Sequence, residues 1–302
     1  MSNVQLKFVN QNFLEIGHHN FFGQYSRSPN GHFIVAWSDS DPSRGVGGAR
    51  KEGLGTYVLL DDSNFILTGK MERPNDGKVA DTGVFILNDW MFSQDLNGTF
   101  YAISPSGAVL LKKTFKANLL NNGLSADGRF AACQTCNSDY EADSSILTIF
   151  DLDRKAVLSQ FVPLTGWAKE YKFESNNHLI SLVYLNGTSY KYKFDGTCID
   201  AAQWQKDREL YGSGYDLLAI AETRLKIFQS SELSQYSEVI DLLKRALDKG
   251  ISDNTQARVH RLLGETYYHC GEKGLAIDHL ETALRLNPKI GVRKLYQSLK
   301  AS

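Results

Sequence analysis

Apolar and polar residues alternate with a period of two along most of the first two hundred residues. Turn-forming pairs, among them Asn-Gly, Asp-Gly, Ser-Gly and Asn-Asn, interrupt this alternation at short intervals. Alternation of this kind places apolar side chains on one face of a strand, and the turn pairs favour hairpins between strands. The pattern therefore predicts a series of short antiparallel strands.

The strand pattern also repeats. Residues 96–107 read LNGTFYAISPSG and residues 185–196 read LNGTSYKYKFDG, at an offset of 89 residues. Gly55 opens a related Gly-Thr-Tyr that precedes Gly98 by 43 residues, and residues 144–150 are the expected copy in between. A second set of turns opens strands at spacings of about 45 to 52 residues, and these segments are 28–37, 81–87, 125–134 and 175–183.

Repeats of about 40 to 50 residues with four strands each are typical of β-propellers. The repeats resemble WD-like blades in architecture, although the Gly-His and Trp-Asp pairs of the WD-repeat family are not at the required places. The alternative is a β-sandwich or an irregular barrel of similar hairpins. Residues 4–16 supply one or two further strands, which either complete the last blade and close the ring or begin a fifth. Four blades are predicted, at residues 20–70, 75–115, 118–162 and 165–202.

From about Asp207 onward the apolar residues recur with helical spacing. One helical hairpin is predicted from residues 215–228 and 236–250, and a closing helix from residues 292–299. Residues 203–214 end in Gly-Ser-Gly and are predicted to be the linker. The expected organisation is a β domain over residues 1–205 and an α-helical domain over residues 215–302.

The segment between those helices reads ARVHRLLGETYYHCGEKGLAIDHLETALRLNPKI, from Ala257 to Ile290. Small, large and turn residues fall at fixed places in it, namely Leu263, Gly264, Tyr267, Ala276, Leu280, Ala283 and Pro288. This pattern resembles a tetratricopeptide repeat, a helix-turn-helix of about 34 residues. His260 departs from it, because the family usually has an aromatic residue there. The hairpin before it is a degenerate repeat at a spacing of 37 residues.

The resemblance implies that stacked hairpins present a groove to another protein. The first-helix positions that face the groove in this family correspond to Arg258, Arg261, Glu265 and Tyr268. Members that clamp a C-terminal carboxylate have Asn where this chain has Glu265, so that specificity is not expected. Two arginines and a tyrosine suit an acidic or aromatic protein segment, and an ordinary solvated helix face is the alternative.

Composition excludes several other classes of protein. The chain has 302 residues, with 33 basic and 34 acidic side chains and a pI of about 6.7. This balance does not favour nucleic acid or an anionic membrane as a partner. No signal segment and no run long enough to span a bilayer are found, so a cytoplasmic location is expected. Four cysteines in a chain of this length do not indicate a disulfide framework.

Candidate chemistry is sparse. Cys133 and Cys136 form a CxxC without a second pair, within a predicted strand, and are interpreted as structural. The glycine-rich segment 45–55 has Arg44, Arg50 and Lys51 near it, which suggests an anion-binding nest, although a flexible hairpin tip is favoured. His18 and His19 are interpreted as part of a solvated turn. We predict no catalytic residue, no metal and no cofactor.

These patterns predict a non-catalytic protein–protein interaction module that acts as an adaptor, regulator or assembly subunit. Its partner would be another protein, a protein segment or a second copy of the chain. The alternative is a propeller that binds or hydrolyses a ligand at its central channel and uses the helices for docking or dimerisation. The side chains that line the channel distinguish the two hypotheses.

Overall fold

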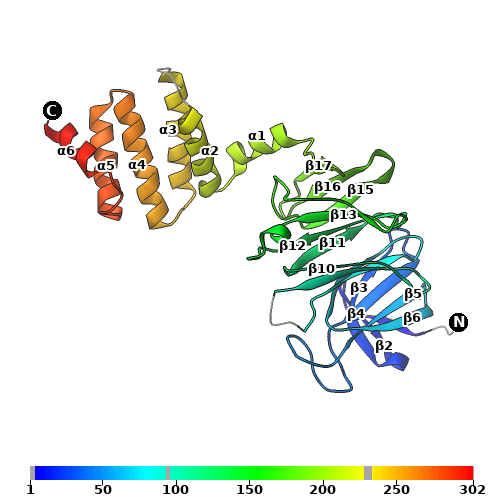
Figure 1. Cartoon of the computed structure of the whole chain (residues 1–302). Helices are drawn as coiled ribbons and strands as arrows, with labels where there is room; N and C mark the ends of the chain where they lie inside the picture. The colour runs from blue at the N-terminus through cyan, green and yellow to red at the C-terminus, as the bar shows by residue number, and fades with distance from the viewer. Residues whose placement is uncertain (1–3, 93–95, 228–232, 302) are drawn as a thin grey trace. The chain divides into compact units, whose positions relative to one another are not determined.

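The computed structural model describes residues 4–92, 96–227 and 233–301. The chain divides into two compact units that meet between Ala201 and Ala202. We call them the β unit and the helical unit, and each is described by itself (Figure 1). The predicted order, a β-rich part followed by a helical part, is confirmed.

Four antiparallel sheets make up the described part of the β unit. The first sheet has six strands, the second and third have four each, and the fourth has three. The strands are β1 (Leu6–Phe8), β2 (Phe13–Ile16), β3 (Phe21–Arg27), β4 (Phe33–Ser38), β5 (Gly55–Asp61) and β6 (Asn64–Met71); β7 (Pro74–Val79), β8 (Phe85–Asp89), β9 (Gly98–Ile103) and β10 (Val109–Phe115); β11 (Leu119–Leu124), β12 (Phe130–Thr135), β13 (Leu147–Asp151) and β14 (Ala156–Phe161); and β15 (Glu170–Glu174), β16 (Leu179–Val183) and β17 (Ser189–Lys193). Short 3₁₀ turns lie at η1 (Gly17–His19), η2 (Glu141–Asp143) and η3 (Ser175–Asn177).

Each sheet corresponds to one of the four predicted repeats. The turns predicted to open strands lead into β4, β8, β12 and β16, and the Gly-Thr segments lead into β5, β9 and β17. The sheets follow one another in chain order, as Figure 1 shows. The prediction of four antiparallel units is therefore confirmed. It succeeded because periodic turns and alternation are local signals, which tertiary packing did not override.

Tight turns join neighbouring sheets at one end of the strands. The backbone N–H of Asn30 donates to Oδ1 of Asp81 at 2.8 Å, and the N–H of Asp81 donates to the carbonyl oxygen of Ala126 at 2.8 Å. Strand contacts between sheets also run in chain order, from β4 to β7, from β8 to β11 and from β11 to β15. Each sheet is thus placed by the sheet before it.

Residues 4–16 close the outer face of the first sheet. Strand β2 pairs with β3, and the N–H of Val4 donates to the carbonyl oxygen of Ser63 at 2.8 Å, in the β5–β6 turn. Leu14 and Ile16 are fully buried. The prediction that this segment completes the last blade or begins a fifth is wrong, because its apolar residues pack on β4 and β5. The shared cluster contains Val4, Leu14, Ile16, Phe21, Ile34, Ala36, Val58 and Leu60.

The fourth sheet ends the array with a polar surface. One of its faces is buried, and Tyr171, Leu182 and Tyr190 lie opposite one another on it. The other face includes Glu174 and Lys191, which form an ion pair with 2.8 Å between Nζ and Oε1. Among the described residues, no substantial strand contact joins this sheet to the first. A charged face does not favour packing against another sheet, so the sheets form an open array.

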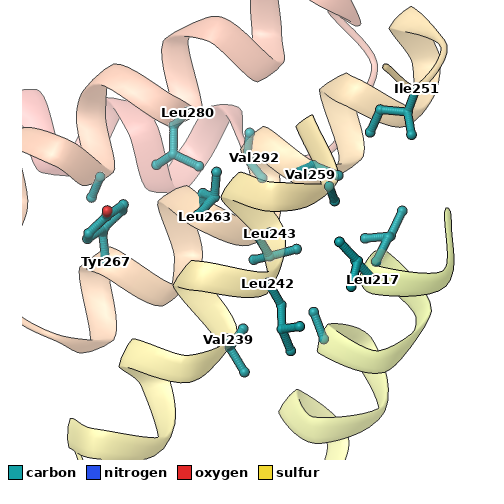
Figure 2. Close-up of a cluster of buried hydrophobic side chains, with 14 of the residues drawn as sticks. Leu217, Val239, Leu242, Leu243, Ile251, Val259, Leu263, Tyr267, Leu280 and Val292 are labelled. Carbon is teal, nitrogen blue, oxygen red and sulfur yellow. The ribbon is translucent and has the colours of Figure 1, made fainter. Parts of the chain in front are cut away.

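The described part of the helical unit contains six helices. They are α1 (Ala201–Tyr211), α2 (Gly214–Ile227), α3 (Leu233–Asp248), α4 (Asp253–His269), α5 (Lys273–Leu286) and α6 (Arg293–Ala301). Helix α2 packs on α3, α3 on α4, α4 on α5 and α5 on α6. Figure 2 shows side chains of the core that these helices share, with Leu217 from α2, Leu243 from α3, Leu263 from α4 and Leu280 from α5 among them.

Helices α4 and α5 approach closely at a glycine. A Cβ atom on Gly264 would lie 2.6 Å from Cγ of Leu280 and 3.1 Å from the carbonyl oxygen of Ala276. Gly271 follows α4 with a φ of +78°, in the left-handed region that favours glycine. The small residues therefore lie where the sequence places the contact between two antiparallel helices.

The predicted linker is largely helical. Residues 203–211 belong to α1, and the chain turns at Gly212 and Ser213 before α2 begins. The closing Gly-Ser-Gly led to the wrong prediction for residues 203–211, because α1 has no buried residue and so no apolar stripe that would indicate a helix. In the part of the chain that the structure describes, no helix has the length and apolar character needed to cross a membrane.

Candidate protein-binding groove

The four predicted groove residues form one stripe along α4. Their spacing of three or four residues places them on the same side of the helix. Three of them, Arg258, Arg261 and Tyr268, are exposed, and Glu265 is half-buried. The opposite side of α4 enters the core through Val259, Leu263 and Tyr267.

Helix α2 supplies the facing side of the groove. A pocket of about 300 Å³ lies between α2 and α4. Leu225 and Leu262 are half-buried and contribute its apolar surface, whereas Lys226 is exposed. The remaining lining residues are Glu222, Arg258 and Arg261. The groove therefore combines an apolar floor with charged walls, which is the arrangement that an amphipathic segment requires.

Both groove arginines already have acidic partners. Nε of Arg258 lies 2.5 Å from Oε1 of Glu222, which links α4 to α2. Nε of Arg261 lies 2.9 Å from Oε1 of Glu265, one turn along the same helix, and its Nη1 donates to the carbonyl oxygen of Ile290 at 3.4 Å. The side chains of Arg258 and Arg261 are nevertheless 59% and 44% exposed. Ligand carboxylates could reach both arginines only in competition with these glutamates.

Sequence reasoning missed the contribution of α2. Glu222 and Lys226 are four residues apart, so they lie on one side of that helix. This spacing was visible in the sequence, but it identifies a polar side and not the helix that it faces. The contact with Arg258 spans 36 residues of chain, and only the packing of the two hairpins brings these residues together.

A histidine pair lies between α4 and α5. Nδ1 of His260 and Nδ1 of His279 are 2.9 Å apart, so one nitrogen carries the hydrogen and the other accepts it. The ring of Tyr267 stacks on His279, with 5.5 Å between centroids. Burial lowers the pKa of both imidazoles, and the positive charge of Arg285 adds to this effect for His260. For His279 the further causes are His260 and Lys244.

We expect the histidine pair to make the helical unit less stable in mild acid. Unfolded histidines take up protons near pH 6.5, whereas the folded pair resists protonation to lower pH. The neutral pair therefore contributes its full stabilisation of the folded helical unit above about pH 6.5. This contribution is lost as the pH falls through the lowered pKa values of the folded state. Urea unfolding followed by circular dichroism at 222 nm between pH 7.5 and 5 measures this slope. His260→Gln with His279→Gln should flatten it, and an unchanged slope would contradict the assignment.

The glycine-rich segment 45–55 is held in place by Arg50, whose side chain is only 6% exposed. Its Nη1 donates to Oδ1 of Asp39 at 2.5 Å, and its Nη2 donates to the carbonyl oxygen of Glu72 at 2.7 Å. Arg44 pairs with Glu52 at 2.7 Å. Both arginines already pair with carboxylates, which opposes an anion-binding nest, and the flexibility of the tip stays a prediction.

The CxxC cysteines are free thiols. Cys133 lies in β12 and is fully buried, and Cys136 follows the strand and is half-buried. Burial raises the pKa of both thiols, so they remain protonated at neutral pH and are weak nucleophiles. This environment is that of structural cysteines.

Among the described residues, one group of three metal-ligand side chains lies close together, with ligand atoms within 4.8 Å of one another. It consists of His32, Asp61 and Asp62. Nδ1 of His32 is 3.4 Å from Oδ1 of Asp62, and both side chains are exposed. His32 precedes β4 and Asp62 follows β5, so pairing of these two strands brings the side chains together. His19 lies in the η1 turn and stacks on Phe65, with 4.2 Å between ring centroids.

Polar residues on the first strands of adjacent sheets bind one another. The carboxylate of Asp76 on β7 accepts hydrogen bonds from the N–H of Asn122 on β11, at 3.0 Å, and from Nζ of Lys78, at 2.5 Å. The hydroxyl of Tyr171 on β15 lies 2.7 Å from Oδ1 of Asn121 and 2.8 Å from Oε1 of Gln134. These hydrogen bonds join the sheets, although Oδ1 of Asn122 is buried without a hydrogen-bond partner among the described residues.

No protein family matches the sequence, and no curated protein does either. Among solved structures, this chain is similar to Sqt1 of Chaetomium thermophilum, which was crystallised bound to the N-terminus of the ribosomal protein L10. The two chains are 10% identical, with a TM-score of 0.42. The similarity covers 62% of this chain and 50% of that one, so it spans half the length of Sqt1.

Proposed function

We propose that this chain is a non-catalytic protein-interaction module, acting as an adaptor, a regulator or an assembly subunit. The helical unit would be a short tetratricopeptide-like array and the β unit an open, WD-like propeller array. The groove between α2 and α4 is the observation that carries the proposal, because exposed charged side chains there surround an apolar floor.

Helix packing supports the tetratricopeptide interpretation. Helices α2 and α3 form one hairpin, α4 and α5 form the next, and α6 covers the last one. Gly264 and Ala276 lie where α4 and α5 meet, and Ala276 is fully buried. Two hairpins make a short groove, so the bound segment would be short or would continue onto another surface.

The groove favours an acidic segment that also carries an apolar side chain. Lys226, Arg258 and Arg261 provide three positive charges. Glu222 and Glu265 provide two negative charges, so the groove has a positive excess. Leu225 and Leu262 would receive the apolar side chain. A carboxylate of the partner would replace Glu222 as the partner of Arg258, so Glu222 acts as a competitor built into the groove.

The proposal predicts opposite effects for two groove variants. Affinity capture with the tagged full chain should retrieve a stoichiometric protein partner, and Arg258→Ala, Arg261→Ala and Tyr268→Ala together should weaken its binding at least about 100-fold. Glu222→Gln should strengthen it about three- to tenfold, because the competing carboxylate is lost. Calorimetric titration of the purified partner into each variant gives these affinities.

Matched substitutions outside the groove serve as the control. Lys249→Ala, Lys273→Ala and Tyr211→Ala also remove two positive charges and a tyrosine, all of them at exposed positions. We expect this triple variant to bind as the unchanged chain does. Equal losses of affinity in the two triple variants would exclude the groove as the binding site. A chain that retrieves no partner would exclude the adaptor role.

The ligand-binding or hydrolytic alternative would need a cluster of reactive groups where the first strands meet. Asp76, Asn122 and Tyr171 lie there, but they form the hydrogen bonds between sheets described above. Burial raises the pKa of Tyr171 well above its usual value, which opposes a role as a proton acceptor. No observation in the described residues favours this alternative over protein binding.

A further inference from the structure

Helix α1 attaches to the helical unit without an apolar anchor. None of its residues is buried, and Leu210 and Tyr211 are 57% and 77% exposed. Helix α6, at the other end of the array, packs on the core through Leu299, and Val292 directly before the helix is also buried in that core. The two terminal helices are thus held by different forces.

Arginines of α2 and α3 hold the C-terminal turn of α1. Nη2 of Arg224 donates to Oε2 of Glu209 at 2.6 Å, and its Nη1 donates to Glu238 of α3 at 3.3 Å. Nη2 of Arg245 donates to the carbonyl oxygens of Glu209 and Leu210. A cation placed on the last carbonyls of a helix also interacts favourably with the helix dipole.

A third arginine fixes the turn into α2. Nε and Nη2 of Arg208 both donate to Oδ1 of Asp216, at 3.0 and 2.9 Å. The other carboxylate oxygen of Asp216 accepts hydrogen bonds from the N–H and hydroxyl of Ser213. The side chains of Arg208, Arg224 and Arg245 are about one-third exposed, at 29%, 29% and 31%.

The interface between α1 and α2 is incompletely packed. A pocket of about 300 Å³ lies between the two helices, lined by Arg208 and Glu209 of α1 and by Ile220 and Arg224 of α2. Ion pairs at this level of exposure contribute little individually and are screened by salt. A helix of 11 residues is also marginal in water once its tertiary contacts are lost.

We propose that α1 is an ionic latch at the junction of the two units, docked by Arg224 and Arg245 and released when these arginines are screened or engaged by another anion. Release lets α1 unfold, because none of its residues is buried in the core. The connection between the units then lengthens by the residues of α1. This inference is independent of the proposed groove function, since Glu222 and Arg258 take no part in it.

Hydrogen–deuterium exchange of the full chain, read peptide by peptide, tests the latch. Raising NaCl from 50 mM to 1 M should speed exchange of the α1 amides about threefold or more, because the Debye length falls to about 3 Å at 1 M. Arg224→Gln with Arg245→Gln should speed it about tenfold at low salt. The α6 amides should change less than about twofold in both cases, since their anchor is apolar.

The matched control is Glu281→Gln, which removes the ion pair of α5 with Lys300 on α6, 3.9 Å between charged atoms. We expect no change in α6 exchange. A second latch variant, Glu209→Gln, removes one contact and leaves the carbonyls of α1 available to Arg245. Equal salt responses in α1 and α6, or faster exchange in α4 together with α1, would overturn the latch, because the effect would then be global.

Discussion

Replacing Leu14 and Ile16 together by alanine is expected to destabilise the β unit by about 5 kcal/mol or more. Each truncation of a fully buried Leu or Ile to Ala costs about 2 to 5 kcal/mol, since it removes buried surface and leaves a cavity. Both side chains are 0% exposed in the cluster beneath β4 and β5. Such a loss approaches the whole stability of a typical domain, about 5 to 15 kcal/mol.

Urea unfolding followed by tryptophan fluorescence measures this loss, because Trp37, Trp90 and Trp167 all lie in the β unit. Lys7→Ala with Glu15→Ala is the matched control on the same pair of strands. These two side chains form an exposed ion pair at 2.9 Å, so we expect a loss below about 1 kcal/mol. A small loss for the Leu14 and Ile16 variant would show that residues 4–16 do not close the first sheet.

Gly264→Val is expected to destabilise the helical unit by about 3 kcal/mol. A Cβ atom at this position would lie 2.6 Å from Cγ of Leu280, so α4 and α5 must move apart to accept a side chain. Added volume in a packed core typically costs about 1 to 3 kcal/mol. The improved helix propensity, worth less than about 1 kcal/mol, offsets only part of this cost.

The same substitution at Gly274 separates the steric cost from the gain in helix propensity. Gly274 lies in the first turn of α5, and a Cβ atom there would have no neighbour within 4 Å. Gly274→Val should therefore leave stability unchanged or raise it by a few tenths of a kcal/mol. Circular dichroism at 222 nm during urea unfolding compares the variants. If the two substitutions had equal effects, the close contact of α4 and α5 would not be what limits stability.

Local patterns in the sequence were sufficient to predict the four sheets and most of the helices. Turns such as the one at residues 125–129 recur before strands of alternating residues, and both signals act within a few residues. The alternation in β2 likewise predicts a strand with one buried face. It carries no information on which sheet covers that face, so the packing of Leu14 and Ile16 could not be inferred.

The groove was predicted only on one side for the same reason. Helical spacing identifies the exposed stripe of α4, from Arg258 to Tyr268, whereas Glu222 reaches it through the packing of two hairpins. Arg50 shows this limit most clearly. Two of its hydrogen-bond acceptors, on Asp39 and Glu72, lie outside the glycine-rich segment, whose glycines indicate only flexibility.

The open array of sheets has a consequence for how such a chain can change in evolution. In a closed ring, an added blade alters the angle at every interface, whereas here the substantial strand contacts among the described residues join only sheets that are consecutive in the chain. The outer faces of the first and fourth sheets are completed by their own residues, Leu14 and Ile16 in one case and charged residues such as Lys191 in the other. Gene duplication could therefore insert a repeat between β10 and β11 and create one new interface, without redesign of either end.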